Sequence, residues 1–366
     1  MRNLLDFKVP FVGFTQINFI DAFTSTYMFV ENFDISGVID YPCPPRKGRG
    51  PCHGCGNFRK GKCENAAVNK VSPYSFLFNT MTGSCSLRRR YDGNPTEMQQ
   101  LIGSTEYIVD FLFGFTGYQY RICSDSDAFK HEIIASINAG RPIIAEAKQS
   151  KGFFHVITGY DDDMLICPTE DYFYKKARPS GAPAYDEIGA LYIYGEKIAP
   201  RYKLIDGLKN IRKVMEYNIN EKLWDEYLVK MGGWDKFPSD DGLDKADMDE
   251  IKERMRCMLD TVRYSMITHI VIKAFQHMHI RHEEMSNAAL TSLWESISRT
   301  SKYMGHGIEN KISRINWNTI RMSTFRGISA EICDEIIKVK EADMAVWGYI
   351  NQAIDILENQ IANVHA

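Results

Sequence analysis

The spacing of apolar residues changes character near residue 200 of this chain. Before that point, short runs rich in β-branched and aromatic residues alternate with Gly, Pro and Asp, as in residues 141–147, 153–160, 163–168 and 190–198. Runs of this kind, bounded by turn residues, are typical of strands joined by short turns. We therefore expect an antiparallel sheet in the second half of an N-terminal domain.

Beyond residue 200 the apolar residues recur at helical spacing. The pattern holds over residues 204–217, 248–275, 289–304 and 330–362. Apolar positions three and four residues apart lie on one face of a helix, and long helices with such faces pack side by side. Residues 201–366 are therefore predicted to form an all-α helical bundle domain.

Three helices are expected in the first half of the N-terminal domain. They cover residues 24–33, 72–81 and 97–114, and the last begins after Pro95 and Thr96, which favour a helix start. Helices that precede a sheet in the chain indicate an α+β domain. We expect a helix packed on an antiparallel sheet over residues 1–200, with chemistry where the two meet.

Composition narrows the function classes. The chain has 366 residues, enough for two domains, and its 44% hydrophobic and 25% charged residues are ordinary for a folded protein. A formal net charge of −3 gives no footprint for nucleic acid. The sequence has neither a secretory signal pattern at its start nor an apolar run of membrane-spanning length. A cytoplasmic protein without nucleic-acid or membrane partners is expected.

The start of the first helix has the layout of an active site. Gln16 lies six residues before Ala22, and Asp21 is expected near the helix cap, so that Ala22 would lie at the helix entrance. A thiol gains reactivity at a helix N-terminus, and an upstream side-chain amide can stabilise an oxyanion. The pattern therefore calls for cysteine where the chain has Ala22.

The residues FTQINFIDAFTSTYMFVEN, 14–32, resemble the papain-like cysteine peptidases, most closely the C39-like branch and the related butirosin-biosynthesis acyltransferases. In that branch a glutamine, four residues and an Asp-Cys pair introduce the central helix. Residues 139–168 resemble the family's later strands, with His155 at the position of the catalytic histidine. The resemblance implies a C39-like helix-on-sheet fold over residues 10–200.

The third catalytic position is less clearly marked. The family usually places Asp or Asn there to hold the imidazole tautomer, whereas this chain has Cys167 followed by Pro168. Thr169 and Asp171 lie just beyond. The orienting residue is therefore Cys167, Thr169 or Asp171, unless a dyad suffices.

Three explanations for Ala22 stay open. The natural protein has lost its nucleophile, an engineered Cys-to-Ala change is present, or Ser25 or Thr24 attacks instead. Retention of Gln16, Asp21 and His155 favours the engineered variant.

The resemblance also implies an activity. A cysteine at position 22 would attack a carbonyl, with His155 as base and Gln16 stabilising the oxyanion, to form an acyl-enzyme. We expect an acyltransferase that moves an acyl group from a carrier-protein thioester to an amine. The alternative is a natural pseudoenzyme that binds a peptide or a carrier protein.

A cysteine-rich insertion covers residues 43–63. Cys52 and Cys55 have the two-residue spacing that lets two sulfurs bind one ion, and Cys43 and Cys63 would complete a tetrahedral structural zinc site. His53 could replace one ligand. A loop of reduced thiols is the alternative. The segment is also basic, which is typical of a solvated loop and would also suit an acidic carrier protein.

Overall fold

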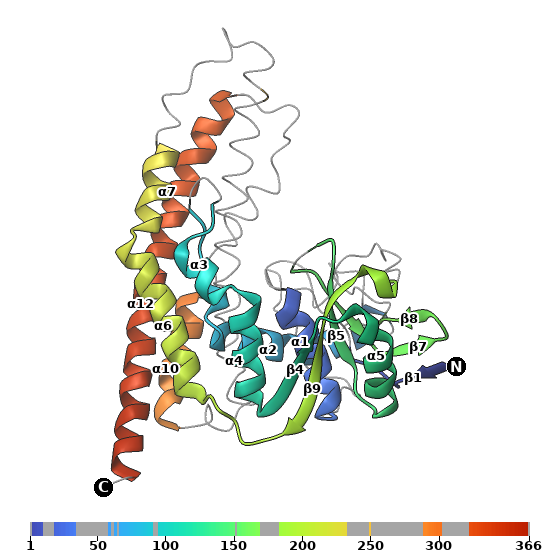
Figure 1. Ribbon diagram of the computed structural model, residues 1–366. Coiled ribbons are helices and arrows are strands. Elements are labelled where there is room, and N and C mark those ends of the chain that lie inside the picture. The colour runs from blue at the N-terminus through green and yellow to red at the C-terminus, as the bar shows by residue number, and fades with distance from the viewer. Residues whose placement is uncertain are drawn as a thin grey trace. The chain divides into compact units, whose positions relative to one another are not determined.

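The computed structural model describes residues 2–9, 18–33, 58–59, 62–63, 66–90, 94–150, 152–168, 183–232, 249, 288–301 and 322–364. Of residues 58–59, 62–63, 66–73, 232, 288, 298, 301, 322–326, 328 and 364 it describes the backbone only. The chain is a mixture of helices and antiparallel sheets (Figure 1). No helix in these ranges is both long enough and apolar enough to cross a membrane.

The chain divides into two compact units, and the division is discontinuous in sequence. The first unit contains residues 1–78 and 108–201, and the second contains residues 79–107 and 202–366. The apolar spacing predicts a single boundary at residue 200, with all earlier residues in the first domain. Residues 79–107 instead have their contacts with the C-terminal helices.

Among the described residues, strands of the first unit form three antiparallel sheets. A four-stranded sheet has the order β4-β9-β5-β6, a three-stranded sheet has the order β1-β7-β8, and β2 pairs with β3. Their bounds are Arg2–Leu4 (β1), Phe58–Arg59 (β2), Lys62–Cys63 (β3), Tyr118–Cys123 (β4), Ile143–Ala147 (β5), Phe154–Ile157 (β6), Gly159–Asp161 (β7), Met164–Ile166 (β8) and Ile188–Lys197 (β9). The strands expected from the apolar runs are therefore present, although residues 153–160 are divided between two sheets.

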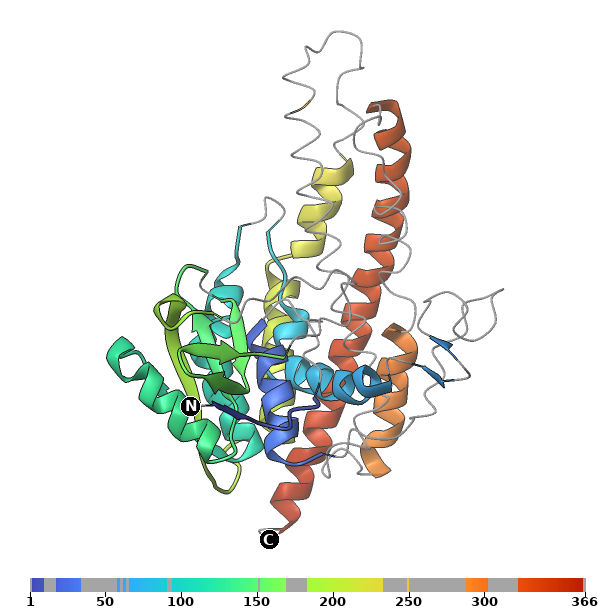
Figure 2. The ribbon, with the colours of Figure 1, turned by 90° about the vertical axis from the view of Figure 1, so that its right-hand side faces the viewer.

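The first unit also contains α1 (Asn18–Val30), α5 (Phe129–Asn138), most of α2 (Ala66–Met81) and most of α4 (Thr105–Thr116). Figure 2 shows α1 in blue and α5 in teal on opposite sides of the green strands. Helix α1 is buried on all sides from Phe19 to Thr26, and the buried hydroxyls of this stretch hydrogen-bond to backbone carbonyls of the same helix.

Three helix predictions need correction. Helix α1 begins at Asn18 rather than at the expected entrance near Ala22, and α2 begins at Ala66 rather than at residue 72. The single helix expected over residues 97–114 is two helices, α3 (Glu97–Ile102) and α4. The break occurs because the Ser104 hydroxyl accepts a hydrogen bond from the Tyr107 amide at 3.3 Å and so caps a new helix. Thr96 caps α3 as expected, accepting from the Gln99 amide.

The second unit is built around the long helix α12 (Met322–Val364), which contacts α6 (Leu204–Asn220), α7 (Leu223–Gly232) and α10 (Ala288–Ser301) (Figure 1). Buried residues of α12 alternate three and four positions apart, as in a coiled-coil seam. The residues at this spacing are Ser329, Ile332, Ile336, Val339, Asp343, Val346, Ile350 and Ala353, and Ala342 and Ile354 are buried beside them. One seam position is thus a carboxylate.

Hydrogen bonds from α6 to backbone carbonyls join residues 79–107 to the C-terminal helices of this unit. Asn210 and Asn218 of α6 donate side-chain hydrogen bonds to the carbonyls of Met81 and Ser86, at 3.0 and 2.7 Å. Gly207 lets α6 approach closely, because a Cβ at this position would lie 2.5 Å from the Met81 sulfur. The spacing of apolar residues does not predict these contacts, because they join segments that are far apart in the sequence.

Candidate functional site

Ala22 lies inside helix α1 and not at its N-terminus. It is the fifth residue of the helix, and its exposed fraction is 0%. The favourable effect of a helix N-terminus on a negative charge falls off within the first turn. Burial without a nearby positive charge raises the pKa of a thiol. This position would therefore hold a cysteine as a buried, neutral thiol.

Asp21 lies in the first turn of the helix and is buried. Its exposed fraction is 1%, and its carboxylate accepts a hydrogen bond from the Ser75 hydroxyl of α2 at 2.9 Å. Asp21 thus lies near the start of the helix, as expected, although the helix begins three residues before it. Asp21 serves the packing of α1 against α2.

The alternative hydroxyl nucleophiles are also buried. The Thr24 hydroxyl donates to the Ile20 carbonyl at 2.6 Å, and the Ser25 hydroxyl donates to the Asp21 carbonyl at 3.2 Å. Both side chains have an exposed fraction of 0%. Hydrogen bonds of this kind, from a hydroxyl to the carbonyl four residues earlier, direct the oxygen along the helix and away from a substrate.

His155 lies on β6, near the edge of the four-stranded sheet. Its ring is half-buried and makes an edge contact with Phe153, with 5.0 Å between ring centroids. Burial lowers the pKa of His155 below the ordinary imidazole value, and the negative charge of Glu187 acts in the opposite direction. The neutral imidazole is therefore favoured.

The side chains of Ala22 and His155 belong to opposite sides of this sheet. Successive side chains of a strand point to opposite faces. Phe154 points toward α1, because its ring contacts Phe19 with 5.1 Å between centroids. His155 consequently points to the other face, as does its cross-strand partner Ala145, which packs in the cluster with α5.

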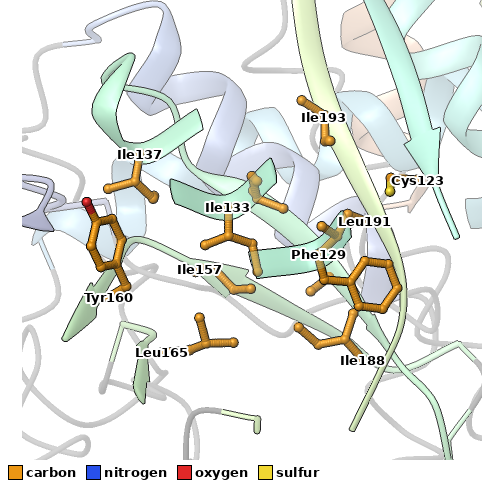
Figure 3. Packing of buried hydrophobic residues seen from close by; sticks show 12 residues of the cluster. Cys123, Phe129, Ile133, Ile137, Ile157, Tyr160, Leu165, Ile188, Leu191 and Ile193 are labelled. Carbon is orange, nitrogen blue, oxygen red and sulfur yellow. The ribbon is translucent and has the colours of Figure 1, made fainter. Parts of the chain in front are cut away.

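The cluster on the His155 side is shown in Figure 3. Ile157, two residues after His155 on β6, lies beside Ile133 of α5. By this alternation, the His155 side chain lies on the face of β6 opposite the one that Phe154 presents to α1.

Cys167 follows β8 and packs against the same cluster. Burial raises the pKa of its thiol to about 12, so the group is neutral and a weak orienter of an imidazole. Gln16, Thr169 and Asp171 lie outside the described residues. Their predicted roles stay predictions.

Sequence reasoning missed the polar contacts at the start of α1. The Asn18 side-chain oxygen accepts a hydrogen bond from the backbone amide of Phe154 at 2.6 Å, joining the helix start to β6. Nearby on the same face of the sheet, Glu146 accepts hydrogen bonds from the Tyr192 hydroxyl at 3.0 Å and from the Gly152 amide at 3.3 Å. The sequence signal that could have indicated this helix start was Asn18, which comes just before an apolar run with helical spacing.

The predicted zinc ligands Cys43, Cys52 and Cys55 lie outside the described residues, and only the backbone of Cys63 is described. Cys63 ends the β2–β3 hairpin, opposite Phe58. The described side chains contain no group of three or more His, Cys, Asp or Glu residues that could hold a metal ion.

Comparison with known proteins adds no relative. No family model matches this sequence, and neither the curated proteins nor the solved structures give a match.

Proposed function

We propose that this chain is a binding protein on a scaffold that resembles a C39-like peptidase, and that Ala22 and His155 do not form a catalytic pair. The observation that carries the proposal is the alternation along β6. Phe154 packs on α1, and His155 therefore faces the cluster with α5. This arrangement favours the pseudoenzyme over the carrier-dependent acyltransferase.

The burial of position 22 supports the same proposal. A nucleophile must reach a substrate carbonyl and be oriented by a base within hydrogen-bond reach. Ala22 has no exposed surface. Restoring a thiol there would place it among helix side chains, without access to an acyl donor.

For the partner we propose an acyl or peptidyl carrier protein. Arg59 and Lys62 are backbone register partners in the β2–β3 hairpin, within the basic insertion. Carrier proteins that are acidic would be attracted by such a basic segment, mainly through faster association. The amine substrate expected of an acyltransferase has no role in this proposal.

A structural zinc ion in the insertion is part of the proposal. The hairpin register sets Cys63 opposite Phe58, and Cys55 precedes Phe58 by three residues in the chain. Three residues span at most about 10 Å, so the chain length allows Cys55 to bind the same ion as Cys63. Four thiolates, or three with His53, would hold zinc tetrahedrally.

The enzymatic alternative is tested by restoring the thiol. The Ala22→Cys protein is incubated with an acyl-pantetheine thioester, and the intact mass is compared with that of Ala22→Cys/His155→Ala. We expect no acylated residue 22 in either protein. An acyl adduct at this residue that depends on His155 would overturn the proposal and support the acyltransferase.

Carrier binding is tested with an acidic acyl carrier protein as the probe. We expect Arg59→Glu/Lys62→Glu to weaken binding at least tenfold at low salt. The control is Lys338→Glu, a charge change on an exposed residue of α12. Equal binding by both variants, or no binding by the unmodified chain, would refute the proposed partner.

A further inference from the structure

Buried polar atoms gather around Arg88 in the second unit. The guanidinium has an exposed fraction of 1% and lies over the Trp224 ring, 5.3 Å from its centroid. Its Nη1 donates to the carbonyls of Cys85 and Leu87 at 3.4 and 3.2 Å, and its Nη2 lies 3.5 Å from the Asp343 carboxylate. Neither Nε nor Nη2 makes a hydrogen bond within the described part of the chain.

Asn218 adds an acceptor to the same place. Its Nδ2 donates to the Ser86 carbonyl at 2.7 Å, between the two carbonyls that Arg88 binds. Its Oδ1 is buried and makes no hydrogen bond with any described residue. Two guanidinium donors and one amide acceptor therefore lie around the three-residue stretch 85–87.

We propose that this cluster is a binding site for an ordered internal water molecule. The water accepts from the Nε and Nη2 edge of Arg88 and donates to Asn218 Oδ1 and to the Asp343 carboxylate. Buried water molecules typically make about three hydrogen bonds, to buried groups that otherwise have no partner. A buried donor without a hydrogen-bond partner destabilises the fold, because the free energy lost in removing it from water is not regained.

The charges of the site favour water over an ion. Arg88 and Asp343 neutralise each other at 3.5 Å, so an added anion would be repelled by Asp343 and an added cation by Arg88. The open groups also include both donors and an acceptor, which suits a ligand that donates and accepts. The water thereby completes the contact between residues 79–107 and the seam of α12.

A crystal structure of the full chain that shows ordered water tests the proposal. We expect a water oxygen at about 2.7–3.2 Å from Asn218 Oδ1 and from Nε or Nη2 of Arg88. Direct pairing of these atoms with protein groups, density for an ion, or a dry site would overturn it.

A solution measurement gives an independent test. The full chain is labelled with ¹⁵N-arginine, and a cross peak is sought between the Arg88 Nε–H proton and water. The resonance is assigned by its loss in Arg88→Lys or, should that variant not fold, by through-bond correlation from the backbone amide. We expect a cross peak between this proton and water, with the sign that indicates a water molecule of long residence time. A protected Nε–H proton without one would contradict the proposal.

Discussion

The carboxylate in the seam of α12 allows the sharpest test of the second unit. Asp343 is 5% exposed, accepts a hydrogen bond from the Trp224 indole at 2.7 Å, and is the ionic partner of Arg88. In Asp343→Ala the buried guanidinium loses its counter-charge and the indole N–H loses its acceptor. Breaking a buried ion pair by removing one partner costs about 3–5 kcal/mol, and we expect a loss of that size.

The double variant Arg88→Met/Asp343→Leu should behave differently. It removes both charges and fills the space with apolar atoms, and such replacements are often neutral or stabilising, by about 1–4 kcal/mol. Urea denaturation followed by circular dichroism measures the free energy of unfolding for each protein. The control is Asp355→Ala, an exposed position on the same helix that should change it by less than about 0.5 kcal/mol.

Two results would refute this account of Asp343. The first is a loss below about 1 kcal/mol in Asp343→Ala, which is the scale of an exposed ion pair. The second is a double variant as unstable as the single one. Either would mean that the pair is hydrated by bulk solvent or that Arg88 has another anionic partner.

Three further predictions concern single residues. The pKa of His155 is lowered in the folded chain, so its contribution to stability should be complete above pH about 6.5, the unfolded value, and should fall as the pH drops toward the folded value. The difference between the urea midpoints at pH 8 and pH 5.5 should therefore be smaller in His155→Gln than in the unmodified chain. An unchanged difference would contradict this. Gly207→Ala should destabilise by about 1–3 kcal/mol through its clash with Met81, whereas Gly348→Ala, with open space around it, should be neutral or stabilise by up to about 1 kcal/mol in thermal unfolding. The neutral thiol of Cys167 should react with a disulfide reagent at pH 8 only after denaturation, and rapid native labelling located by peptide mass spectrometry would show that it is accessible.

Zinc content is a separate prediction for the insertion. Elemental analysis of the purified chain should give about one zinc ion per molecule, since four ligands make one tetrahedral site. The variant Cys52→Ser/Cys55→Ser should lose it, whereas Cys333→Ser on α12 should retain it. A metal-free unmodified chain, or equal zinc in both variants, would remove the site.

The strands were predictable because their signal is local. Residues 143–147 and 188–197 are short apolar runs between turn residues, and such runs form strands wherever a partner is present. The helices of the C-terminal unit were predictable for the same reason, because the helical spacing of apolar residues is also a local signal. The coiled-coil spacing of α12 extends this pattern and includes Asp343, whose partners come from residues 79–107 and α7.

Other features depend on contacts between distant segments. The start of α1 was placed too late, because Phe19 and Ile20 are buried by tertiary packing and give no periodic boundary. Alternation within residues 153–157 puts Phe154 and His155 on opposite faces, and the sequence contains that information. Which face α1 covers is decided by the packing of Phe19, and spacing does not reveal it.

The pH dependence of alkylation at position 22 tests the central claim most directly, and it needs no substrate. The Ala22→Cys protein and its Ala22→Cys/His155→Ala counterpart are treated with iodoacetamide from pH 5 to 9.5, and modification of this residue is followed by peptide mass spectrometry. A buried thiol away from the imidazole should react slowly, only toward high pH, and equally in both proteins. Fast alkylation near pH 6 that is lost with His155→Ala would show a thiolate–imidazolium pair and contradict the account.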